Sequence, residues 1–183
     1  MRSPFPPLPA LRSLGDLADR VPVLMIDTRE QTPLVPTRLP CERGTLQSGD
    51  YSIKGVEYLF AIERKSIADL VACCKSGTKA AEGERERFER ELHRLRGYRF
   101  KRLLIVGTVR EIEAGAYRSE MKPAAVMHTL KAFVVRYDIQ TVFCPTAEQA
   151  ARQVEDWAYW FAREIVSEAD DLLRGSKKGE VTT

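Results

Sequence analysis

Short apolar runs of strand length alternate along this chain with longer segments of helical periodicity. The runs occupy residues 23–26, 58–62, 103–106 and 141–143. After the second run, Phe88, Leu92 and Leu95 recur at the spacing of one helix face. Buried strands and amphipathic helices give these two patterns, so their alternation predicts an α/β fold. A length of 183 residues suits one hydrophobic core, and we expect a single folded domain.

Proline and capping signals set the expected limits of this domain. Five of the ten prolines fall at positions 4, 6, 7, 9 and 22, so residues 1–20 are predicted to form a mobile, Pro-rich arm. The folded domain is expected over residues 21–174. It closes with a helix over 147–173 that follows a capping box of Thr146 and Gln149 and is about 40 Å long. Residues 175–183 are predicted to be a flexible tail.

Turn residues in the first half of the chain predict antiparallel strands. An irregular loop is expected over 27–40, followed by a meander of two or three strands at Thr45–Leu46, 51–53 and 58–62. A helix is expected directly after these strands, because Ser66 and Asp69 have the spacing of a capping box.

Composition and motifs exclude several classes of protein. The formal charge of +3 permits an anionic partner without requiring one. No stretch approaches the ~18 consecutive apolar residues of a membrane span, and residues 1–13 lack the apolar core of a secretory signal, so an intracellular protein without membrane association is expected. A P-loop and a Gly-x-Gly pair are both absent, so no nucleotide cofactor is expected. The four cysteines form no C-x-x-C pair and there are only two histidines, so any metal ion should be bound by oxygen.

Charged residues follow the apolar run 58–62 where a central strand should still be partly buried. Because side chains alternate along a strand, Glu63 and Lys65 are expected on one face and Arg64 on the other. A hairpin would place Asp50 beside Glu63. Two adjacent carboxylates repel unless a cation lies between them, and Mg²⁺ prefers such oxygen ligands together with water and phosphate. The pattern therefore predicts metal-assisted hydrolysis of a phosphodiester.

The same residues resemble a known motif. Gly49-Asp50, a spacer, and then Glu63-Arg64-Lys65-x-x-x-Asp69 is similar to the G-D-x(n)-E-R-K-x-x-x-D motif of XPF-type structure-specific endonucleases. Asp27-x-x-Glu30 after an apolar strand resembles the opening acidic segment of that family. The resemblance implies a restriction-endonuclease-like core with a central mixed sheet flanked by helices. It also implies dependence on Mg²⁺ or Mn²⁺, cleavage of branched or junction DNA, a role in DNA repair, and a homodimer or heterodimer formed through the nuclease domain.

Motif and spacing together assign roles to individual residues. We expect Asp50, Glu63 and Lys65 to be catalytic, with Asp27 and Glu30 assisting them. The predicted metal ligands are Asp50, Glu63 and Asp27. Three further residues are expected to support the site: Arg64 through an ion pair with one of the acids, Asp69 as a helix cap or as part of the site, and Arg29.

Positive charge is concentrated between Lys79 and Arg102, where nine Lys or Arg residues face five Glu, a balance of +4. Glu86 with Arg90, and Arg87 with Glu91, have the i, i+4 spacing of weak salt bridges on a solvated helix. The alternative is that a set of basic residues binds DNA phosphates without reading base sequence. This set comprises Lys75, Lys79, Arg94, Arg96 and Arg99.

These observations lead to one expected function and two alternatives. The expected function is a metal-dependent DNA endonuclease that hydrolyses phosphodiester bonds, at branched or junction DNA. The first alternative is a non-catalytic DNA-binding scaffold or subunit with the same fold. The second is a sequence-specific, restriction-like nuclease.

Overall fold

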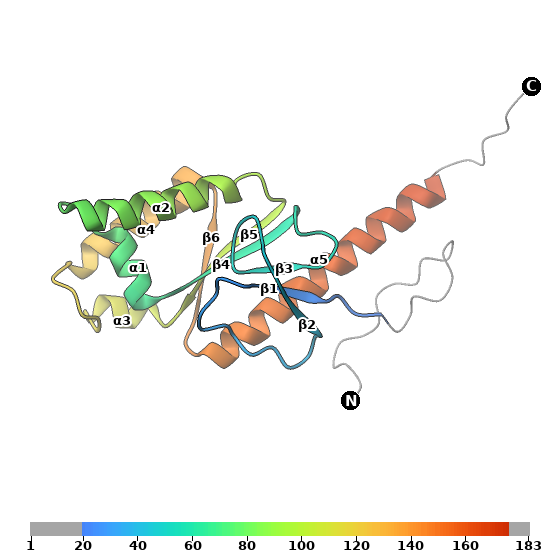
Figure 1. Cartoon of the computed structure of the whole chain (residues 1–183), viewed down its shortest axis with the longest axis horizontal. Coiled ribbons are helices and arrows are strands. Elements are labelled where there is room, and N and C mark those ends of the chain that lie inside the picture. The colour runs from blue at the N-terminus through green and yellow to red at the C-terminus, as the bar shows by residue number, and fades with distance from the viewer. Residues whose placement is uncertain (1–19, 176–183) are drawn as a thin grey trace, which may run out of the picture.

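The computed structural model describes residues 20–175, which form one mixed six-stranded sheet with helices on both faces (Figure 1). The strand order is β2-β1-β3-β4-β5-β6. The strands are β1 (Leu24–Asp27), β2 (Cys41–Gly44), β3 (Tyr51–Ile53), β4 (Phe60–Ser66), β5 (Phe100–Val106) and β6 (Gln140–Cys144). The helices are α1 (Ile67–Cys74), α2 (Lys79–Leu95), α3 (Val109–Glu113), α4 (Pro123–Tyr137) and α5 (Ala147–Gly175).

The two halves of the sheet differ in strand direction. Strands β4, β5 and β6 run parallel, with Glu63 of β4 opposite Leu103 of β5. Strand β3 is antiparallel to both β1 and β4. The parallel half needs crossover helices, and α1 and α2 connect β4 to β5 in this way.

A separate hydrophobic core lies on each face of the sheet. On one face, Phe88 and Leu92 of α2 pack with α1, α4 and alternate residues of β4 and β5. On the other face, Val154, Ala158 and Phe161 of α5 pack against β1, β3 and the remaining residues of β4. Figure 1 shows α1 to α4 grouped at one end, with α5 crossing beneath the strands and extending beyond them.

The register of the central strands brings three acidic residues to one level of the sheet. Tyr51 pairs with Ile62, and the Asp50 N–H donates to the Ile62 carbonyl at 2.8 Å, so Asp50 lies opposite Glu63. The Asp27 N–H donates to the Asp50 carbonyl at 2.9 Å. The predicted hairpin between residues 50 and 63 is therefore confirmed.

Several predicted elements differ from those observed. The prediction of a strand at Thr45–Leu46 is wrong, because the strand at this place is β2, over Cys41–Gly44. This edge strand runs parallel to β1 and is not part of an antiparallel meander. Strand β4 begins at Phe60 and continues through Ser66, so the charged residues lie within it. Helix α2 begins at Lys79, because the Thr78 side chain accepts the Ala81 N–H as its cap.

The long closing helix is confirmed as α5, and the Thr146 side chain accepts the Gln149 N–H at 3.2 Å as its cap. Apart from residues 20 and 175, the predicted arm over 1–20 and tail over 175–183 lie outside the described residues. Within residues 20–175, none of the helices combines the length and apolar character that a membrane span requires.

Candidate active site

A pocket of about 570 Å³ opens where β1, β3 and β4 meet the side of α2. Its acidic lining residues are Asp27, Glu30, Asp50, Glu63, Asp69 and Glu91. Its basic lining residues are Arg29, Arg64, Lys65 and Arg87. All eight predicted catalytic and supporting residues therefore lie in one place, although they come from positions 27 to 69 of the chain.

Gly49 sets the position of Asp50. Its backbone has a positive φ of 76°, and a Cβ there would lie 2.9 Å from the Ile62 carbonyl oxygen. Both the conformation and the close approach require glycine, because an L side chain would meet the backbone of β4. This explains in physical terms why Gly precedes Asp in the motif.

One oxygen of the Asp50 carboxylate accepts a hydrogen bond from the protein backbone. Its Oδ2 accepts the Arg64 N–H at 2.7 Å, while Oδ1 has no hydrogen-bond partner in residues 20–175. Burial raises the pKa of Asp50, and the charges of Glu30 and Glu91 add to this effect, whereas the Arg64 N–H and Lys65 oppose it. Asp50 is thus a partly buried acid that a cation would stabilise in its ionised form.

Glu63 is the most enclosed acid of the pocket, with only 1% of its surface exposed. Its Oε1 accepts a short hydrogen bond from Lys65 Nζ. Its Oε2 is buried and has no hydrogen-bond partner among residues 20–175. Burial raises the pKa of Glu63, the neighbouring charge of Asp50 raises it further, and Lys65 acts in the opposite direction.

Lys65 connects the strand with α2. Its Nζ contacts Glu63 and lies 5.2 Å from the centre of the Phe88 ring. Burial alone would lower the pKa of Lys65, but the charge and hydrogen bond of Glu63 outweigh it and raise this pKa. Lys65 is therefore a fixed ammonium group beside the two carboxylates, as strand alternation predicts.

The donor set fits a hard divalent cation. Among residues 20–175, Glu63 offers an oxygen without a hydrogen-bond partner, and Asp50, directly before β3, offers a second. No group of three or more His, Cys, Asp or Glu side chains within residues 20–175 is arranged to hold a metal ion alone. A pair of carboxylates is the arrangement that Mg²⁺ commonly uses, since it keeps several waters and takes further oxygens from substrate phosphates.

Asp27, which was predicted as a third metal ligand, has both oxygens occupied. Its Oδ1 accepts Arg29 N and Nε, at 2.7 and 2.8 Å, and its Oδ2 accepts Arg29 Nη2 and the Leu46 N–H, at 3.0 and 2.7 Å. Burial opposes ionisation, but these bonds outweigh it and lower the pKa of Asp27. In this structure Asp27 joins β1 to the following loop, and its role toward a metal stays a prediction.

Arg64 forms the ion pair that strand alternation predicts. Its Nη2 lies 3.3 Å from Glu30 Oε1 and donates to the Thr32 carbonyl and hydroxyl at 2.7 and 2.8 Å. Asp69 forms the predicted capping box, because its Oδ2 accepts the Ser66 backbone N–H at 3.4 Å while its own N–H donates to Ser66 Oγ at 3.1 Å. Asp69 also lines the pocket, so both expected positions apply to it.

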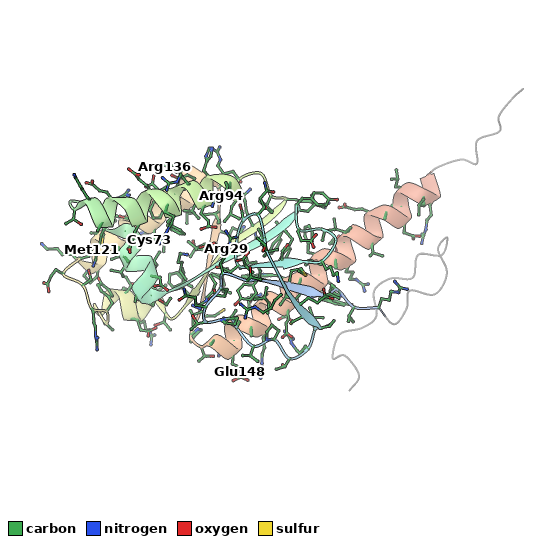
Figure 2. All side chains as sticks on the ribbon, in the orientation of Figure 1. Arg29, Cys73, Arg94, Met121, Arg136 and Glu148 are labelled. Carbon is green, nitrogen blue, oxygen red and sulfur yellow. The ribbon has the colours of Figure 1, made fainter. Side chains whose placement is uncertain are left out.

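The five basic residues predicted to bind DNA do not form one group. Lys75 is the C-cap residue of α1, and Lys79 begins α2, about 25 Å along that helix from Arg96 at its other end. Arg94 lies above the sheet in Figure 2, where its Nε donates to Ser48 Oγ at 3.2 Å. Arg99 is paired with Glu168 of α5 through both of its terminal nitrogens.

Sequence reasoning missed the contribution of α2 to the pocket. Arg87 and Glu91 line it, and the salt bridge predicted between them is not formed, because Glu91 pairs with Arg94 at 3.6 Å. The sequence signal for this contribution was the position of the two residues: Arg87 directly precedes the buried Phe88, and Glu91 follows it by three residues. Which strand this helix face would meet depends on tertiary packing, which a single sequence does not specify.

Comparisons with known proteins identify the fold and the family of this chain. Two solved structures of XPF from Aeropyrum pernix, one of them in complex with DNA, are similar to this chain at 19% sequence identity and a TM-score of 0.59. The similar regions cover 81% and 78% of this chain and 69% and 66% of those chains. This similarity confirms the predicted restriction-endonuclease-like fold. A comparison with curated protein sequences gave no match. The model of the ERCC4 domain matches residues 26–156, more than half of the sequence, and the chain therefore belongs to the ERCC4 domain family, a family of DNA endonucleases.

Proposed function

We propose that this protein is a divalent-metal-dependent endonuclease that hydrolyses phosphodiester bonds of DNA at branches or junctions. One observation carries the proposal: in the part of the chain that the structure describes, the buried Glu63 carboxylate keeps an oxygen without a hydrogen-bond partner, beside Asp50 and Lys65 in an open pocket. A buried carboxylate of this kind is costly unless a ligand satisfies it. Mg²⁺ or Mn²⁺, held by Asp50 and Glu63, would satisfy it.

Each residue of the site has a task in phosphodiester hydrolysis. When bound, a divalent ion would supply Lewis acidity, which activates water and stabilises charge that develops on the phosphate. Asp50, directly before β3, and Glu63 of β4 would hold the ion. Lys65, fixed by Glu63 and packed on Phe88, presents an ammonium group that orients the attacking water or neutralises the developing charge.

The choice of DNA as substrate rests on the family and on the fold. The chain belongs to the ERCC4 domain family, and one similar structure is of XPF from Aeropyrum pernix in complex with DNA. A preference for branched substrates is what the G-D…E-R-K-x-x-x-D motif implies for this chain.

A cleavage panel tests the proposal directly. Labelled flaps, forks, splayed arms, four-way junctions and plain duplex are incubated with the protein, with and without Mg²⁺ or Mn²⁺. We expect metal-dependent cleavage that is strongest on a branched substrate. Asp50→Asn and Lys65→Ala should each lower the cleavage rate by about 10²-fold or more, because each removes a group that acts in the transition state. Both variants should fold and bind DNA. Wild-type rates in both variants would refute the assignment, and equal cleavage of duplex and branched DNA would refute the substrate preference.

We also propose that the protein acts as a homodimer formed through α5. This helix exposes 54% of Trp160 and 75% of Leu172, and it extends past the end of the sheet (Figure 1). Apolar side chains on a projecting helix lose contact with water when two copies pack together.

A further inference from the structure

The face of α2 that meets the pocket is fixed by packing. Phe88 is buried, and its ring lies 5.2 Å from Lys65 Nζ, so this turn of the helix stands directly beside the two catalytic carboxylates. Arg87 is the preceding residue, and it lines the pocket together with Glu91, one turn further along. Helix α2 thus forms a wall of the site opposite the strands.

Arg87 differs from the other cations of the pocket. Arg29 is paired with Asp27, Arg64 with Glu30, and Lys65 with Glu63. In the part of the chain that the structure describes, Arg87 has neither an ion pair nor a hydrogen bond from its side chain. Its expected partner Glu91 is 3.6 Å from Arg94 instead. Three pocket cations are therefore neutralised by the protein, and one guanidinium is left for a ligand.

The chemistry of this cation indicates the ligand. A guanidinium presents donors in a planar fork that matches two oxygens of a phosphate, and it keeps its charge at all physiological pH values. The surrounding carboxylates would repel an anion, so an anionic substrate needs a cation that the acids have not already bound. A phosphate group next to the reacting one is the part of such a substrate that would fit the Arg87 guanidinium.

We propose that Arg87 binds a backbone phosphate of the nucleic acid strand that enters the pocket, and that α2 is thereby the strand-positioning wall of the active site. This inference rests on the proposed function, because the reacting phosphodiester is taken to lie at Asp50, Glu63 and Lys65. It adds a residue at the centre of α2 to the basic residues that the sequence predicts to bind DNA. The contact is to phosphate, so it should be independent of base sequence.

The experiment measures the affinity of labelled forked DNA by fluorescence anisotropy, over a range of KCl concentrations and with Ca²⁺ in place of Mg²⁺. Arg87→Gln should weaken binding by about ten-fold and lower the slope of log affinity against log salt by about one, because one phosphate contact is lost. Arg87→Lys should recover part of the affinity, since it keeps the charge but not the fork.

Arg90→Gln is the matched control. Arg90 lies on the same helix, has the same charge, pairs with Glu86 at 3.6 Å and does not line the pocket. It should leave affinity and salt slope unchanged. The inference is overturned if Arg87→Gln matches the wild type in both quantities, or if Arg90→Gln weakens binding as much. A chain that binds DNA through Arg87 but cleaves no substrate would refute the proposed function and leave this inference standing.

Discussion

The carboxylates of Asp50 and Glu63 lie next to each other in a largely buried position, and Lys65 contacts Glu63. Burial raises the pKa of both acids, so in the absence of a metal each ionised carboxylate lowers the stability of the folded state. Favourable packing in the rest of the fold therefore keeps these two carboxylates together, in a site prepared for a cation. Active sites commonly show this conflict between stability and function.

Replacing Asp50 should reveal this conflict. Burial raises the pKa of Asp50 to about 6, from 3.8 in a model peptide. A carboxyl whose pKa is higher in the folded than in the unfolded protein binds its proton more tightly in the folded state. Its ionisation above the folded pKa therefore lowers the free energy of unfolding, and this loss disappears as the pH falls toward 4. Asp50→Asn should therefore unfold with a free energy about 1–3 kcal/mol larger than the wild type at pH 8.

Urea unfolding in EDTA checks this prediction, and the comparison at low pH is its control. The difference between Asp50→Asn and the wild type should shrink to near zero by about pH 4, where Asp50 is protonated in the folded protein. Saturating Mn²⁺ at pH 8 should stabilise the wild type more than the variant. A variant that is less stable than the wild type at pH 8 would contradict the account.

Residue-level prediction from sequence succeeded where local rules apply. Alternation along β4 puts Glu63 and Lys65 together and Arg64 with Glu30, and the hairpin puts Asp50 opposite Glu63. It did not show that the oxygens of Asp27 accept hydrogen bonds from Arg29 and the Leu46 N–H, because a loop conformation decides where that backbone N–H lies. A strand has a fixed side-chain period, whereas a loop has none.

At the scale of elements, α5 does more than cover the sheet. Glu155 is fully buried in it, and its carboxylate accepts the N–H groups of Arg38 and Leu39 and pairs with the Arg38 guanidinium at 2.9 Å. The helix thus anchors the segment that leads into β2, although more than a hundred residues separate the two along the chain. A buried acid with several donors is a specific tether rather than a source of large net stability.

Removing that tether should destabilise the whole fold. Glu155→Gln leaves the Arg38 guanidinium facing an amide and removes one acceptor, so the free energy of unfolding should fall by about 2–4 kcal/mol. Glu148→Gln is the control, since Glu148 lies on the same helix in an exposed pair with Arg152. Thermal unfolding should separate the two variants by several degrees. Equal midpoints would show that the tether contributes nothing.

The sequence predicts a helix or strand well where the apolar residues of that element form a clear pattern. Strands β5 and β6 and helix α5 carry a clear apolar pattern and lie where expected. Strand β2 was missed because Cys41, Glu42 and Arg43 are all exposed at the edge of the sheet, where no apolar signal marks a strand. Its parallel pairing with β1 is a tertiary property that turn signals do not encode.

For the whole molecule, the length of α5 exceeds what the sheet can cover. Its 29 residues span about 43 Å, and its last turns lie beyond the strands (Figure 1). Trp160 and Leu172 remain exposed along this helix, and Arg163 lies over the Trp160 ring at 5.7 Å. A second copy of the chain that packs its own α5 here would cover both residues.

Sedimentation equilibrium at micromolar concentrations should then give about twice the 20.8 kDa of one chain. Leu172→Asp and Trp160→Ser should shift this mass toward that of a single chain, because a buried aspartate or a lost indole weakens an apolar interface. Val135→Asp is the matched control: Val135 is 83% exposed on α4, away from α5, and its replacement should leave the mass unchanged. A wild-type mass of 20.8 kDa at tens of micromolar, or an equal effect of Val135→Asp, would remove the basis for a dimer through α5, and the proposed nuclease site would then have to function within one chain.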